Sequence, residues 1–153
     1  MFLGGDIAHH GSEFRPTQYL PLPDEIDPNP LVAPRTSSAP VCPGHIFEAI
    51  HPSKSRTETF TSPTLGEHAI HHVPQDARDS VDKMTDFDGH DSIFPVIAHD
   101  ESLFDVVDFY PASANDWKAK GWKTEGVWRF LRDFDTGSAD HKPQYEPSVR
   151  NKA

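Results

Sequence analysis

Two short apolar runs stand out from a chain that is otherwise largely polar. Residues 1–5 (MFLGG) end in two glycines, and residues 93–98 (IFPVIA) are followed by His-Asp. Short apolar runs bounded by turn-forming residues predict buried β-strands. A strand that ends in Gly-Gly has no side chains around its tip, so another group can approach the backbone closely there.

The clearest helix is predicted just before the second strand, from Pro74 to about Asp86. Pro74 suits the first turn, Asp76 suits the positive end of the helix dipole, and Gly89 is a typical C-terminal stop. Apolar residues recur at spacings of three and four, as one helix face requires, namely Val73, Ala77, Val81, Met84 and Phe87. A helix of this kind packs against a sheet before the chain returns into a strand, which predicts an α/β fold.

The segment from residue 15 to residue 43 contains eight prolines. Proline lacks the backbone N–H and fixes φ, so this segment is expected to hold no regular helix and no central strand. Two interpretations stay open. It is either an extended surface linker or a loop that wraps over the mouth of a site, with Tyr19, Leu20 and Leu22 packing against the pocket.

The remaining elements are predicted to be short. Residues 43–51 predict a helix with Ile46, Phe47 and Ile50 on one face. Residues 53–64 predict a loop, or an edge strand around 57–61, and residues 100–107 predict the start of a short helix. The aromatic-rich residues 117–134 predict a packing element that covers the sheet. Residues 1–135 would then form one partial domain, and the polar residues 136–153 a disordered tail.

The composition of the chain argues against several classes of function. The chain of 153 residues is only 35% hydrophobic and carries a net charge of −10. A strongly acidic chain argues against binding to nucleic acid or to an anionic membrane. No apolar run approaches a membrane span or a signal peptide, so a cytoplasmic location is the default expectation. Cys42 is the one cysteine, which excludes an internal disulfide, and it suggests a packed or half-exposed thiol rather than a nucleophile.

Candidate chemistry lies at the ends of the two predicted strands. Asp6 follows the first strand, with His9 and His10 on the loop behind it, and His99 and Asp100 follow the second strand. Carboxylate and imidazole are ligands that Zn, Mn and Fe prefer. Asp100 is either a helix N-cap or a group that orients His99. The alternative for Asp6 is an ordinary turn or helix start.

A second group of histidines comes directly before the long helix. Its members are His68, His71 and His72, which could share one helix face and bind a metal. Pro74 lies just beyond them, so a helix through His72 is not expected to continue. A solvated loop cluster is therefore favoured over a metal site.

The segments LGGDIAHHG…FRPTQYLPLP and FPVIAHDESL resemble the C-terminal half of a metallo-β-lactamase-fold hydrolase, in the lactonase-like branch common in fungi. The resemblance implies part of an αββα sandwich in which Asp6 bridges two zinc ions and His99 completes the shell of the second ion. It also implies that His9, His10 and Asp100 are nearby candidates for binding or orientation, and that the substrate is a small cyclic ester or lactone.

The His-x-His-x-Asp-His motif of that family does not occur in the chain. We therefore expect a fragment that binds zinc weakly or not at all and is inactive alone, with the missing N-terminal half as a candidate partner. A non-catalytic pseudoenzyme or interaction module that retains the half-fold is the alternative.

Overall fold

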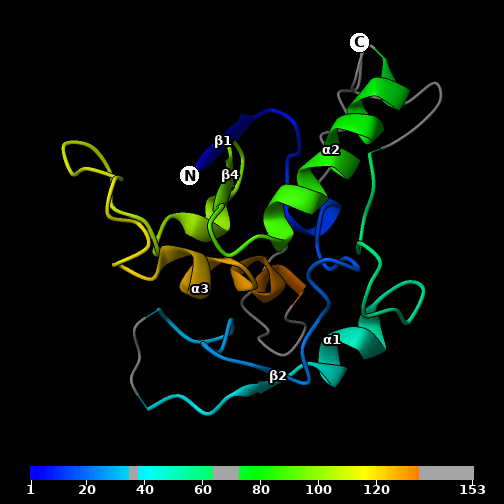
Figure 1. Ribbon diagram of the computed structural model, residues 1–153. Helices are drawn as coiled ribbons and strands as arrows, with labels where there is room; N and C mark the ends of the chain where they lie inside the picture. The colour runs from blue at the N-terminus through cyan, green and yellow to red at the C-terminus, as the bar shows by residue number, and fades with distance from the viewer. Residues whose placement is uncertain (35–37, 64–72, 135–153) are drawn as a thin grey trace, which may run out of the picture.

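The computed structural model of the protein describes residues 1–34, 38–63 and 73–134. Strand β1 (Phe2–Gly5) pairs in parallel with β4 (Pro95–Ile97), and the ladder has an irregularity between Leu3 and Gly5. These are the two strands predicted from the apolar runs. Both lie beside the long helix (Figure 1), so the mixed architecture is compatible with the predicted α/β fold class.

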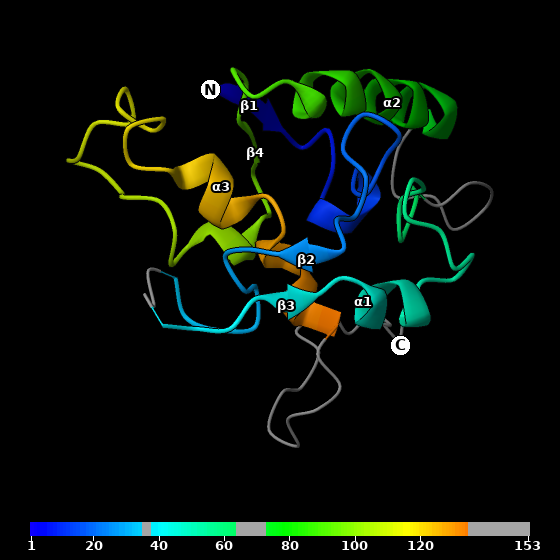
Figure 2. The same ribbon diagram turned by 60° about the horizontal axis from the view of Figure 1, so that its bottom comes forward.

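Helix α2 (Pro74–Gly89) covers the β1–β4 pair, as Figures 1 and 2 show from two sides. Val81 and Met84 are buried, which confirms the centre of the predicted apolar stripe. The ends of the stripe were predicted wrongly. Val73 and Phe87 are 48% and 42% exposed, while Asp88, on the last turn, is 1% exposed because it pairs with a buried arginine.

Gly89 belongs to the helix and does not adopt the left-handed conformation of a typical C-terminal stop. Its lack of a side chain serves a close contact instead. A Cβ at this position would lie 2.7 Å from the Cβ of Tyr19, so the loop before residue 20 can press directly on the last turn of the helix.

The proline-rich segment, residues 15–43, is more than an extended surface linker or a loop that wraps over a site. It contributes β2 (Glu25–Ile26) and β3 (Cys42–Pro43), a short antiparallel pair that leads into α1 (His45–Ile50). Its apolar residues build a core with the aromatic block near the end of the described chain. The buried members are Leu22, Ile26, Cys42, Phe47, Phe60, Trp128, Phe130 and Leu131.

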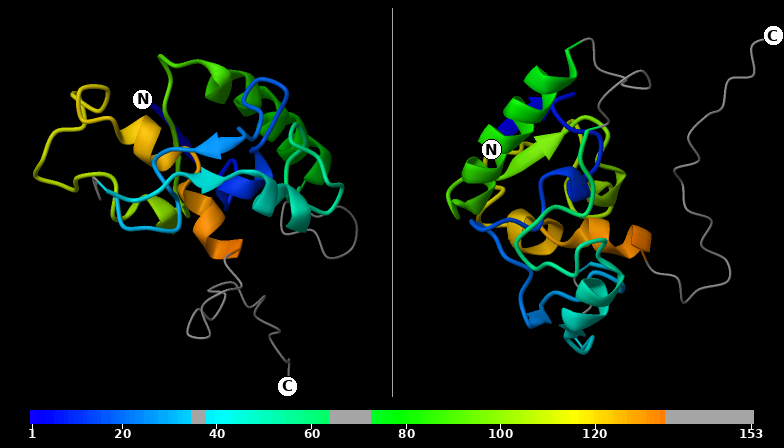
Figure 3. Two further views of the ribbon diagram at one scale, coloured as in Figure 1. Left: turned by 90° about the horizontal axis from the view of Figure 1, so that it is seen from below. Right: turned by 90° about the vertical axis from the view of Figure 1, so that its right-hand side faces the viewer.

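The C-terminal aromatic residues pack inside the molecule, which confirms their prediction as a closing element. Helix α3 (Trp122–Gly126) and the 3₁₀ helix η3 (Arg129–Phe134) carry them beneath the strands (Figure 3). A separate core cluster joins Trp117 and Trp122 to residues that come before and after β4 in the chain, namely Phe94, Leu103 and Val106.

One of the shorter predictions needs correction, and for another the structure selects one of the two alternatives. On α1 only Phe47 is buried, whereas Ile46 and Ile50 are 37% and 46% exposed, because one short helix turn faces the core with a single side chain. Residues 53–63 form a loop and not an edge strand. The histidine group at 68–72 and the predicted tail at 136–153 lie outside the described residues. In the described part of the chain, no helix has the length and apolarity needed to cross a membrane.

Candidate metal centre

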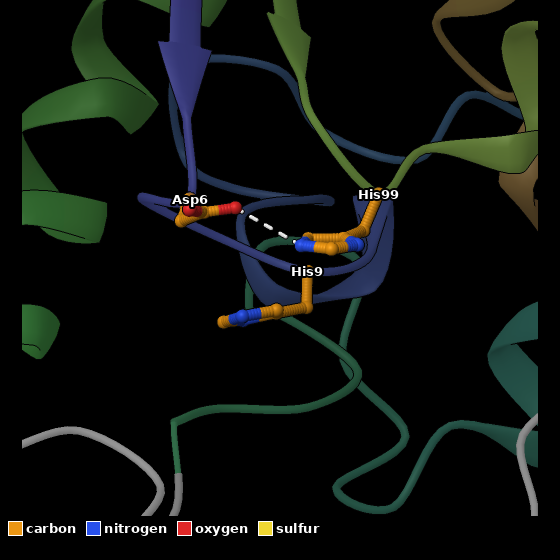
Figure 4. Close-up of side chains that lie close together, drawn as sticks. All are labelled: Asp6, His9 and His99. Carbon is orange, nitrogen blue, oxygen red and sulfur yellow. Dashed lines mark hydrogen bonds and ion pairs between the residues drawn. The ribbon is translucent and has the colours of Figure 1, made fainter.

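The parallel pairing of β1 and β4 brings Asp6 and His99 together. Both strands end at the same edge of their sheet, and the Ala98 amide donates to the Gly5 carbonyl at 2.9 Å, directly before His99 and Asp6 in the sequence. Gly5 has φ of +55°, a left-handed conformation that favours glycine and turns the chain at the strand tip. Asp6 Oδ1 then lies 3.0 Å from His99 Nε2 (Figure 4).

The loop after β1 returns His9 to the same place. Ala8 is completely buried, and the His9 amide donates to Glu13 Oε1 at 3.2 Å, which closes the loop on η1 (Gly11–Glu13). The His9 ring stacks on the His99 ring, with 5.0 Å between centroids and 20° between planes. The distal ends of both rings point toward the side on which Asp6 lies (Figure 4).

These three side chains fit a single metal ion. One ligand atom from each of Asp6, His9 and His99 lies within 4.8 Å of the others, and this is the one such group of three or more that the described residues contain. Ligands around tetrahedral zinc sit roughly 3.3–3.6 Å apart, given bonds of about 2.0–2.2 Å. Small side-chain rotations would bring the three atoms to that spacing. One carboxylate and two imidazoles are also a suitable donor set for zinc.

The cluster is open to solvent. The side chains of Asp6 and His99 are 74% and 56% exposed. An ion held there would keep water at its remaining positions, and the surrounding dielectric would stay high. Both conditions weaken the electrostatic effects on which metal-assisted hydrolysis depends.

Two other predicted candidates do not join the cluster. His10 Nε2 pairs with Asp133 Oδ2 at 3.0 Å, and its Nδ1 accepts the Ser12 amide, so the ring caps η1 and faces the C-terminal aromatics. Asp100 is 6% exposed, and its carboxylate accepts bonds from the amide and hydroxyl of Ser102. The N-cap interpretation of Asp100, at the start of η2 (Glu101–Leu103), is therefore confirmed.

Two buried arginines, Arg15 and Arg129, each pair with a carboxylate, and no pattern in the sequence predicted either pair. Arg15 and Asp88 are both 1% exposed and bond in a bidentate manner. Arg129 bonds Asp105, whose side chain is partly exposed. Partial burial acts to raise the pKa of Asp105, but the hydrogen bond from Arg129 and the charges of Arg129 and Arg132 outweigh it and hold the pKa below its ordinary value.

A separate open cavity of about 690 Å³ lies against the outer face of α2. None of Asp6, His9 and His99 lines it. Its walls are Tyr19, Asp79, Asp82, Lys83, Asp86 and Phe87.

Comparison with known proteins adds fungal relatives. The chain is 48% identical over 134 residues to a protein named γ-lactamase FDB1 from Fusarium pseudograminearum, a match covering 88% of the chain and 31% of that protein. It is 32% identical over 134 residues to the metallo-hydrolase mfmC of Annulohypoxylon moriforme, covering 88% of the chain and 33% of that protein.

A third relative carries a different name. The cytochrome P450 monooxygenase mpaDE of Penicillium roqueforti is 33% identical over 138 residues, which is 88% of the chain but only 13% of that protein. The chain thus spans about a third or less of the length of these relatives. No protein-family model and no solved structure matches the chain.

Proposed function

The chain belongs to the metallo-β-lactamase-fold hydrolase superfamily, in a branch with fungal γ-lactamases and metallo-hydrolases, and on that premise we propose that it carries one side of a metal-dependent hydrolase site. The observation that supports this most is the convergence of Asp6 and His9, on the loop after β1, with His99, which lies 93 residues beyond Asp6 in the chain. The substrate class we propose is a small cyclic ester, lactone or γ-lactam.

Asp6, His9 and His99 would hold zinc in this proposal. When bound, zinc polarises a carbonyl oxygen and lowers the pKa of water toward neutrality. The chain's own contribution is geometric. The β1–β4 ladder fixes the Asp6 carboxylate relative to the His99 imidazole, and the exposed side of the cluster leaves a path for a small substrate. Glu13, which accepts the His9 amide, holds the loop closed.

We further propose that the site is incomplete without additional polypeptide. Two metal ions need about five to seven protein ligands, and one structural zinc alone usually takes four. The described cluster supplies three, and its high exposure leaves water in place. Zinc should therefore bind weakly, and residues 1–135 would act as the C-terminal part of an αββα sandwich whose other ligands come from outside the segment shared with the relatives.

The test is hydrolysis of γ-lactam and lactone substrates with zinc present. The chain alone should show no turnover above buffer. Joined to the part of the Fusarium γ-lactamase that lies outside the match, it should gain zinc-dependent hydrolysis that Asp6→Ala abolishes. His10→Ala is the matched control, because His10 lies on the same loop outside the cluster and should leave turnover intact.

Two results would contradict the proposal. Turnover by the chain alone that Asp6→Ala abolishes would show a complete site. A folded, joined protein that never hydrolyses any of these substrates would favour the non-catalytic interaction module instead.

A further inference from the structure

The loop that carries Asp6 and His9, residues 6–15, ends at a buried arginine, Arg15. Arg15 donates from Nε and Nη2 to the two oxygens of Asp88 at 2.6 and 2.8 Å, and from Nη1 to the Val127 carbonyl at 3.0 Å. Its guanidinium also lies 4.4 Å from the centroid of the Phe14 ring. Arg15 therefore ties the end of the loop to the last turn of α2 and to the end of α3.

This arrangement fixes geometry more than it adds stability. A buried ion pair loses most of its Coulombic gain to desolvation, and apolar side chains of similar volume are often equally stable. An apolar pair cannot reproduce the fixed directions of the Arg15 hydrogen bonds. The planar guanidinium places its three bonds to Asp88 and Val127 at fixed angles, so Arg15 can occupy one position only.

The three ligands of the candidate site depend on different anchors. Asp6 and His99 follow directly from the paired ends of β1 and β4, so the sheet sets their separation. His9 lies three residues farther along, between the sheet and Arg15. The path of the loop there is set by the burial of Ala8, by the Glu13 carboxylate that accepts the His9 amide, and by the Arg15 bonds that anchor the chain two residues after Glu13.

We propose that Arg15 is a positioning residue for His9, and that the Arg15–Asp88 pair sets the third ligand of the metal site. The inference rests on the proposed function, since it assumes that Asp6, His9 and His99 share an ion. It assigns the pair a specific role, which is to hold the His9 ring against His99 while leaving the Asp6–His99 pair to the sheet.

A double-mutant cycle tests this role. Cobalt(II) affinity, followed by visible absorption, is measured for the wild type, Arg15→Lys, His9→Ala and the double variant. Arg15→Lys keeps the charge but loses the bidentate fork. We expect a loss of about tenfold, in the range seen when groups that orient metal ligands are removed. In the His9→Ala background, Arg15→Lys should cause no further loss of cobalt affinity.

A purely structural role predicts a different result. Arg15→Lys would then lower the affinity equally with and without His9, which would overturn the inference. Arg129→Lys is the matched control, because Arg129 is also buried and bonds Asp105 and the Pro30 and Val32 carbonyls, none of which belongs to residues 6–15. It should destabilise the protein without changing cobalt affinity.

A metal-free measurement separates this inference from the proposed function. Stacking shifts the ring protons of His9 and His99 in the NMR spectrum. Arg15→Lys, or Arg15→Met with Asp88→Leu if the lysine variant does not fold, should abolish that shift, and Arg129→Lys should keep it. If the wild type binds no cobalt, the proposed function fails while this shift still decides the positioning role. A shift unchanged in the folded Arg15 variants would refute it.

Discussion

Gly44 lies directly against the backbone of Pro23, and replacing it with alanine should destabilise the protein. A Cβ there would stand 1.9 Å from the Pro23 carbonyl oxygen and 3.1 Å from its carbon. That oxygen cannot move freely, because it accepts a bond from Arg56 Nη2 at 2.9 Å, and the Gly44 amide donates to the Asp24 carbonyl at 2.7 Å. Any shift that removes the clash strains both bonds.

Two opposing effects decide whether Gly44→Ala raises or lowers the free energy of unfolding. Gly44 has φ of −63° and ψ of −29°, which alanine adopts readily, so the loss of freedom in the unfolded chain would stabilise the variant by about 0.4–1 kcal/mol. Overpacking against backbone costs about 1–3 kcal/mol, and a weakened hydrogen bond about 1 kcal/mol more. The net expectation is a loss of about 1–3 kcal/mol in the free energy of unfolding.

Urea unfolding followed by tryptophan fluorescence measures this loss. Trp128 shares a core cluster with Phe47, on the helix that Gly44 precedes, so it reports on the affected region. Gly121→Ala is the comparison, because its Cβ would meet nothing within 4 Å and only its φ of +71° is unfavourable. It should cost about 1 kcal/mol. A Gly44→Ala variant as stable as wild type would refute the packing argument.

Two further predictions concern the ion pairs that Arg15 and Arg129 form. Asp88→Asn should lower the free energy of unfolding by about 3–5 kcal/mol, since it leaves the Arg15 charge buried without a counter-charge; a loss below 1 kcal/mol in urea unfolding would contradict this. Asp105→Asn should cost about 1 kcal/mol at pH 7, given the partial exposure of the pair. The pKa of Asp105 is lowered in the folded state, so its contribution is complete above the ordinary pKa of 3.8 and is lost as the pH falls through the lowered value. The difference in stability between the two proteins should therefore shrink as the pH falls below 3.8, and a difference that stays constant on acidification would count against the assignment.

The sequence predicted the elements that rely on local pattern. Two apolar runs gave β1 and β4, and the helical period gave the centre of α2. The resemblance of the two motifs to a known family also implied that Asp6 and His99 would lie close together, and the Asp6 Oδ1 and His99 Nε2 atoms are 3.0 Å apart. The metal role of these residues remains a prediction.

What the sequence could not supply depends on tertiary contacts. His9 and His10 are adjacent and chemically identical, yet the turn at Gly5 and the capping of η1 send one toward His99 and the other toward Asp133. No feature of the neighbouring sequence distinguishes these two histidines. Arg15 looked like the start of a proline-rich connection, and its partner is 73 residues away in sequence. The apolar residues of that connection are spaced irregularly, so no period revealed that they form a core.

The most direct test of the account is a zinc titration of the purified chain by isothermal calorimetry. The account predicts one weak site, with an affinity lowered further by Asp6→Ala and by His99→Ala and left unchanged by His10→Ala, the control on the same loop. Zinc binding that is equally strong in the Asp6, His99 and His10 variants would contradict the claim that the strand ends form a metal site.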